Sequence, residues 1–139
     1  MIELVGLQKS FGAKQVLAGV DLTIPDGSIF GLVGINGAGK STLLRLLAGV
    51  LKADGGQILA DGEAVYENEE KKREIFFLPD DPYYATGTTA EKLIDLYRTF
   101  YTFDENVFAE YEQKFQIRRR TPIRNFSKGM KRQLFIALA

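Results

Sequence analysis

The sequence contains neither cysteine nor histidine, and this excludes two common kinds of site. Without cysteine there is no disulfide framework, and without either residue there is no zinc site of the Cys/His type. A bound metal would have to be held by oxygen ligands, which suits Mg²⁺ together with phosphate. The candidate metal ligands are therefore carboxylates and hydroxyls.

A net charge and a long hydrophobic run are also missing. The 139 residues include 18 basic and 18 acidic side chains, so no overall field favours nucleic acid or an anionic membrane surface. No window reaches the roughly 18 to 20 apolar residues that a membrane span needs. Residues 1–4 lack the basic leader of a signal peptide. We therefore expect a cytoplasmic chain with no nucleic-acid partner and no direct insertion into the membrane.

The composition that is present, 45% hydrophobic and 26% charged residues, is ordinary for a soluble globular domain. Residues 2–4 suggest a first strand, and residues 20–24 alternate apolar and polar side chains as a half-buried strand does. A short strand is expected at residues 57–60. The apolar stretches at residues 29–33 and 75–78 do not alternate, which predicts strands buried on both faces of a parallel sheet.

Helical patterns dominate the rest of the chain. A leucine-rich helix is expected from Lys40 to Ala48, closed by Gly49. Thr88 and Glu91 predict a capping box at the start of a second helix. Asp104 and Ser127 are expected to cap two further helices, the last of which continues to the end of the sequence. The order of elements predicts an α/β fold in which strands and a glycine-rich loop precede a helical part.

The glycine-rich loop at residues 34–41 matches the P-loop pattern G-x-x-x-x-G-K-[ST]. Its glycines allow backbone N–H groups to approach phosphate oxygens, and the following helix presents its positive end to the same anion. Lys40 would place its charge on the β and γ phosphates, Ser41 would offer a hydroxyl to Mg²⁺, and Thr42 would reach the α phosphate. The predicted phosphate-binding residues are Gly34, Ile35, Asn36, Gly37, Ala38, Gly39, Lys40, Ser41 and Thr42.

A chance match in a glycine-rich turn is the alternative for this loop. The loop lies between a buried apolar stretch and an amphipathic helix, which is the context that the motif requires. The residues around it, 32–43, closely resemble the Walker A sequence of ABC-type ATPases, including Asn36. In that register, Phe11 stands where the family has an aromatic side chain that stacks on adenine, and Val16 would pack near the ribose and base. Without the register, Phe11 would equally fit an ordinary packing residue.

A second resemblance lies at residues 125–133, which are similar to the ABC signature motif, Leu-Ser-Gly-Gly-Gln. Ser127 and Gly129 keep the serine and the second glycine, whereas Lys128 and Met130 depart from the usual pattern. In the family, this helix start binds the γ phosphate of the nucleotide on the opposite subunit, which gives Ser127, Lys128 and Gly129 a role in trans. Taken alone, the same residues also fit a helix capped by Ser127 with a basic first turn.

Asp80 stands where the family has the Q-loop glutamine, which is a magnesium ligand and a sensor of the transmembrane subunit. Aspartate can still bind magnesium through oxygen, but its side chain is shorter and charged. Asp80 is followed by Asp81 and Pro82. Together with residues 126–130, this segment resembles ATPases that pair with ABC-2-type permeases, most of which are exporters.

The resemblance covers the whole chain and implies a P-loop ATPase fold of ABC type. That fold has a mixed sheet with flanking helices, an N-terminal antiparallel β part and a helical insertion. We expect a partial nucleotide-binding domain with a β part and P-loop core at 1–82, a helical subdomain at 83–126 and a signature helix at 127–139. The family's Walker B aspartate and catalytic glutamate are expected beyond Ala139. No catalytic residue is therefore expected within the chain, and residues 1–139 alone should not turn over ATP.

The implied function is that of a subunit that uses ATP and Mg²⁺, dimerises with a second ATP-binding subunit and drives a separate permease subunit, in the direction of export. Such a subunit would lie at the inner face of the cell membrane through its permease. Two alternatives remain: a soluble ABC-type ATPase in translation or DNA repair, and a nucleotide-binding module without turnover. The balanced charge favours the transport function over a nucleic-acid-linked one.

Overall fold

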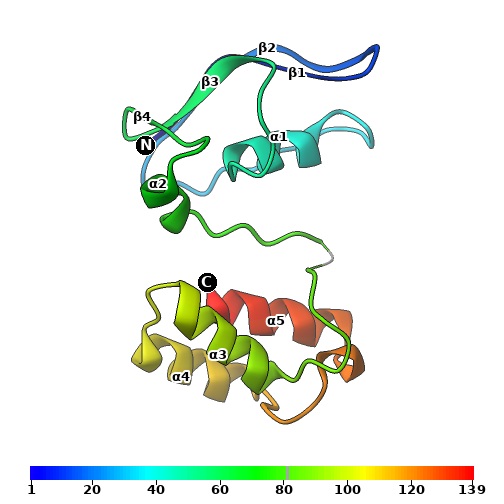
Figure 1. Cartoon of the computed structure of the whole chain (residues 1–139), viewed down its shortest axis with the longest axis vertical. Helices are drawn as coiled ribbons and strands as arrows, with labels where there is room; N and C mark the ends of the chain where they lie inside the picture. The colour runs from blue at the N-terminus through cyan, green and yellow to red at the C-terminus, as the bar shows by residue number, and fades with distance from the viewer. Residues whose placement is uncertain (81) are drawn as a thin grey trace. The chain divides into compact units, whose positions relative to one another are not determined.

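The computed structural model describes residues 1–80 and 82–139, so Asp81 of the Asp80-Asp81-Pro82 segment lies outside the described residues. The chain forms two compact units, Met1–Phe77 and Leu78–Ala139 (Figure 1). In the part of the chain that the structure describes, no helix has the length and apolar character needed to cross a membrane.

The first unit is built on a four-stranded sheet in the order β2-β1-β3-β4, with antiparallel pairing between all neighbours (Figure 1). Its strands are β1 (Ile2–Phe11), β2 (Lys14–Ile24), β3 (Gly55–Ala60) and β4 (Glu63–Ala64). The hairpin of β1 and β2 is paired from Ile2 opposite Ile24 to Phe11 opposite Lys14. Pairing therefore continues to Phe11, and the chain turns directly after it.

Helix α1 (Lys40–Leu47) shares one hydrophobic core with the sheet. This core consists of Leu4, Leu7, Leu17, Leu43, Leu46, Ile58, Ala60 and Val65. The helix ends as expected at Gly49, which has φ +64°. The N–H of Gly49 donates to Leu46 O at 2.9 Å and the N–H of Val50 to Arg45 O at 2.9 Å, which is the Schellman pattern. A short helix, α2 (Glu69–Arg73), follows the sheet.

The two strands predicted at residues 29–33 and 75–78 are wrong, because neither segment belongs to the sheet. Ile29 and Val33 are 103% and 93% exposed rather than buried. A parallel strand needs hydrogen-bonded neighbours in its own sheet, and the strands of the described residues form an antiparallel sheet instead. An apolar pattern indicates that a segment can be buried, but it does not show that another strand is there to pair with it.

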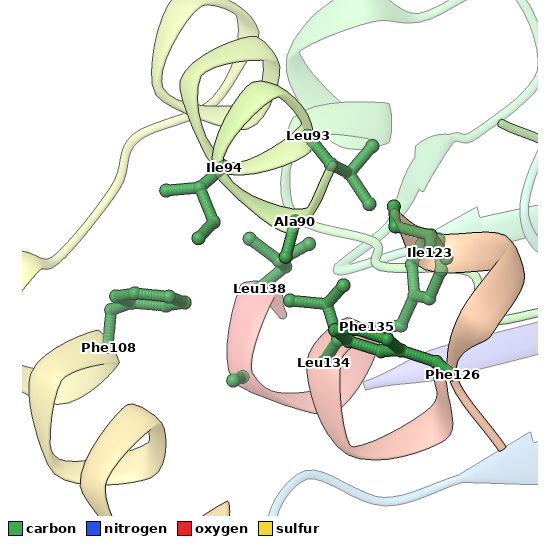
Figure 2. Close-up of a cluster of buried hydrophobic side chains, with 10 residues drawn as sticks. Ala90, Leu93, Ile94, Phe108, Ile123, Phe126, Leu134, Phe135 and Leu138 are labelled. Atoms are coloured by element: carbon green, nitrogen blue, oxygen red, sulfur yellow. The ribbon is translucent and has the colours of Figure 1, made fainter. Parts of the chain in front are cut away.

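The second unit consists of three helices and a 3₁₀ turn around a separate core (Figure 2). Its elements are α3 (Ala90–Phe100), α4 (Glu105–Phe115), η1 (Ile123–Asn125) and α5 (Lys128–Leu138). Figure 2 shows the core side chains of these four elements converging. They are Ala90, Leu93, Ile94, Phe108, Ile123, Phe126, Leu134, Phe135, Ala137 and Leu138.

Two of the three predicted helix caps in this unit are confirmed. The Asp104 carboxylate accepts from the N–H groups of Asn106 and Val107, and the Ser127 hydroxyl accepts from that of Met130 at 3.2 Å. The capping box at Thr88 is wrong by one residue, because Thr89 caps α3. Thr88 lies before the helix, and its carbonyl oxygen accepts a hydrogen bond from the N–H of Ile123 at 2.9 Å. The carbonyl oxygen of Thr89 accepts from the N–H of Leu93 at 3.2 Å, as that of an N-cap residue does.

Candidate functional site

The glycine-rich loop before α1 folds around the ammonium group of Lys40. Lys40 Nζ donates to the carbonyl oxygens of Gly34 at 2.5 Å and Ile35 at 2.8 Å. The loop residues 34–38 are exposed, and Lys40 itself is half-buried. The lysine charge is therefore held at the mouth of the loop, where it is accessible to an anion from solvent.

Two glycines in the loop have backbone conformations that other residues rarely adopt. Gly37 has φ +86° and Gly39 has φ +90°. A Cβ on Gly39 would also lie 2.9 Å from Cγ1 of Val16 and 3.3 Å from its carbonyl oxygen. The loop is thus packed directly against β2 at Val16, which brings one of the predicted base-side residues to the phosphate-binding segment.

The start of α1 is open to an anionic ligand. Gly39 is the N-cap, no side chain accepts a hydrogen bond from the first turn, and no acidic residue lies in that turn. The amide N–H groups at a helix start need acceptors, and the helix dipole favours a negative charge there. Ser41 is exposed and Thr42 is half-buried in the same turn. Phosphate fits this arrangement in both charge and hydrogen bonding.

Phe11 lies at the last position of β1, at the tip of the hairpin, and is 51% exposed. The ammonium of Lys9 lies 5.5 Å from its ring centroid. Within the described residues, no hydrogen bond or ring contact joins Phe11 to the glycine-rich loop. The structure thus brings Val16 to the loop and leaves the ring of Phe11 available to a ligand.

The predicted signature residues begin α5 in the second unit. Ser127 is the N-cap, and Lys128 and Gly129 are exposed in the first turn. A cleft of about 390 Å³ lies beside them, lined by Asp80, Pro82, Lys128, Lys131 and Arg132. The sequence indicated the basic first turn but not this cleft, because residues 80–82 are about fifty positions away in the chain.

Asp80 is paired with a cation in the structure. Its carboxylate, 90% exposed, accepts a hydrogen bond from Arg132 Nη2 at 3.3 Å. Asp80 belongs to the second unit and Ser41 to the first. Among residues 1–80 and 82–139, no cluster of three or more acidic side chains could hold a metal by itself. Ser41, in the first turn of α1, offers a hydroxyl oxygen, and oxygen ligands such as hydroxyls and phosphates are those that Mg²⁺ favours.

Comparison with known proteins identifies the family. A family model described as "ABC transporter" matches residues 17–139. The chain belongs to the ABC transporter family. The matched range includes both the glycine-rich loop and the start of α5.

Curated ABC relatives differ in what their names assign to them. The chain is 39% identical to the ABC transporter ATP-binding protein YtrB of Bacillus subtilis, covering 100% of this chain and 48% of that protein. It is 28% identical to the lantibiotic transport ATP-binding protein SrtF of Streptococcus pyogenes, covering 100% of this chain and 61% of that protein. It is also 46% identical, over 55% of its length and 22% of the relative, to the sulfate/thiosulfate import protein CysA of Methylococcus capsulatus. The chain spans about half the length of the curated relatives that match it throughout.

Solved structures show the same ABC fold. An ATP-binding subunit of an ABC transporter superposes with a TM-score of 0.87 at 27% identity, covering 100% of this chain and 61% of that one. A second ABC ATP-binding protein, from Pyrococcus furiosus, gives a TM-score of 0.80 at 24% identity over 99% of this chain and 68% of that one. The predicted fold class, an ABC-type P-loop ATPase domain, is confirmed.

Proposed function

We propose that this chain is the nucleotide-binding part of a transporter subunit that couples MgATP binding and hydrolysis to transport through a separate permease. The observation that carries the proposal is the glycine-rich loop, in which Lys40 is held beside the uncapped start of α1. Family membership supports it, because ABC ATP-binding proteins generally hydrolyse ATP. The subunit would be cytoplasmic and would reach the inner face of the membrane through its permease.

In this proposal, different residues bind different parts of the nucleotide. The loop from Gly34 to Thr42 would hold the phosphates, with Lys40 as the point charge and Ser41 on the magnesium ion. Phe11 and Val16 would hold the base and ribose. A second ATP-binding subunit would contribute Ser127, Lys128 and Gly129 to the same nucleotide.

Turnover needs more than residues 1–139 contribute. Phosphoryl transfer requires a positioned water and a group that accepts its proton, and the protein acts mainly by positioning and electrostatics. In this proposal, residues 1–139 would provide the phosphate cradle, one metal hydroxyl and a serine that acts in trans. We expect residues 1–139 alone to bind nucleotide without hydrolysing it above background, as measured by phosphate release at saturating MgATP.

Export is the proposed direction. The resemblance of residues 80–82 and 126–130 to ATPases of ABC-2-type exporters supports it. Vesicles of opposite orientation would separate the two directions, because only an exporter loads inside-out vesicles when ATP is added outside.

The decisive experiment is affinity purification of the full-length protein from membranes. We expect a membrane protein to co-purify, and we expect ATPase activity of the complex that Lys40→Ala abolishes. Recovery with ribosomes or DNA, and without any membrane protein, would contradict the transport function and support a soluble ABC-type ATPase.

A further inference from the structure

The segment that leads into α3 is held to α5 by contacts with two successive basic residues. Asp80 accepts a hydrogen bond from Arg132 at 3.3 Å, and Lys131 Nζ lies 5.3 Å from the ring centroid of Tyr84. Tyr84 and Leu78 also pack against the core of the second unit, to which α5 contributes. Residues on both sides of position 81 are thus attached to the same helix.

The charge of Asp80 is opposite to that of the residues around the start of α5. Three cations, Lys128, Lys131 and Arg132, line the cleft at the start of α5, and among the described lining residues Asp80 is the acidic one. Cations near a helix N-terminus are disfavoured by the helix dipole, whereas a carboxylate is favoured there. The Asp80 carboxylate therefore compensates for both the basic turns and the helix end.

We propose that Asp80 is a positioning residue that acts through Arg132 rather than through a metal ion. Its ion pair, supported by the contact between Tyr84 and Lys131, fixes the segment before α3 to the start of α5. Because Ser127 caps that helix, a displacement of Asp80 is transmitted to the residues that contact nucleotide in trans. This consequence rests on the proposed function, since it assumes that the segment faces the permease and that Ser127 meets the nucleotide of a second subunit.

The test is a charge-swap cycle in the full-length protein with its permease, using Asp80→Arg, Arg132→Asp and the double variant. Each single variant should speed amide hydrogen exchange at Leu78, Tyr83 and Tyr84 and lower permease-dependent stimulation of ATPase activity by about two- to fivefold, the size expected for an exposed ion pair. The double variant should recover both. Glu110→Gln is the matched control, because this exposed carboxylate on α4 makes no ion pair among the described residues.

Two further measurements, at high salt and without metal, distinguish an ion pair of Asp80 with Arg132 from magnesium binding by Asp80. Raising the salt to about 1 M should reproduce the single variants in the parent protein, because exposed charges are screened. The affinities for MgATP and for metal-free ATP should change equally in all variants. Additive effects in the cycle, or a loss confined to MgATP in the Asp80 variant, would overturn the proposal and assign the carboxylate to magnesium. Failure of the proposed function would appear separately, as ATP binding that survives Lys40→Ala.

Discussion

Among single residues, Gly39 is constrained in two ways. Its backbone has φ +90°, and a Cβ added to it would lie too close to Val16. Gly39→Ala should destabilise the protein by about 1 to 3 kcal/mol from backbone strain, with a further cost from the contact. It should also weaken ATP binding, because the loop would have to move away from β2. Thermal unfolding and calorimetry measure the two effects.

Gly12→Ala is the matched control for this substitution. Gly12 also has a positive φ, +58°, but no atom lies within 4 Å of a Cβ built on it. The two variants therefore share the strain and differ in the contact. Equal losses of stability, with ATP affinity unchanged in both, would show that packing between the loop and Val16 is unimportant.

The ring of Phe11 gives the second prediction at this scale. If it stacks on adenine, Phe11→Ala should weaken ATP and ADP alike by roughly 1 to 3 kcal/mol, the range for base–aromatic stacking. Phe11→Tyr should retain binding. Since the ring is 51% exposed, its removal should alter the unfolding temperature little. An unchanged affinity with lowered stability would make Phe11 a packing residue.

At the scale of elements, the cap of α4 tests whether local sequence sets the helical unit. The Asp104 carboxylate accepts from the N–H groups of Asn106 at 2.9 Å and Val107 at 3.1 Å. Asp104→Ala should therefore cost about 1 kcal/mol of stability. Glu110→Ala, an exposed change within the same helix, should be nearly neutral. Equal effects of the two substitutions on the free energy of unfolding, measured by chemical denaturation, would show that the Asp104 cap does not stabilise the helix.

The end of α4 is tied to the following loop by an ion pair, and this gives a pH dependence. Both Glu112 oxygens accept from Arg119, whose guanidinium also lies 5.6 Å from the ring centroid of Phe108. Hydrogen bonding from Arg119 holds the pKa of Glu112 below its ordinary value of 4.5. The stability that this pair contributes is present above that value and is lost as the pH falls through the lowered pKa.

Glu112→Gln should therefore reduce the acid sensitivity of the fold. Between about pH 6 and about pH 3, the unfolding temperature of the variant should fall less steeply than that of the parent. The variant should unfold at a lower temperature than the parent at about pH 6 but not at about pH 3. Parallel curves for the two proteins would show that the pair contributes nothing to acid stability.

Sequence patterns predicted those elements whose signals are local. The helix at Lys40, its end at Gly49 and the caps at Asp104 and Ser127 each depend on neighbouring residues, and all are confirmed. The predicted strand at residues 29–33 depended on partners elsewhere in a sheet, so its apolar run was insufficient. The choice of Thr89 over Thr88 depended on a hydrogen bond between Thr88 and Ile123, which are far apart in the sequence.

At the scale of the whole molecule, the predicted phosphate-binding loop and Ser127 lie in different compact units, Met1–Phe77 and Leu78–Ala139. The pairing of Asp80 with Arg132 had no sequence signal, because it joins residues 52 positions apart. The proposed transport function and the proposed roles in trans both rest on the candidate nucleotide site in the first unit.

Calorimetric titration of the full-length protein with MgATP, for the parent and for Lys40→Ala, tests that site most directly. Loss of the charge at the loop mouth should weaken binding by about 10- to 100-fold, since hydrogen bonds to charged groups contribute about 1.5 to 3 kcal/mol. Lys92→Ala, which removes an exposed lysine of α3, should leave the affinity unchanged. Equal affinities for parent and Lys40→Ala would contradict the assignment of the loop as the ATP site.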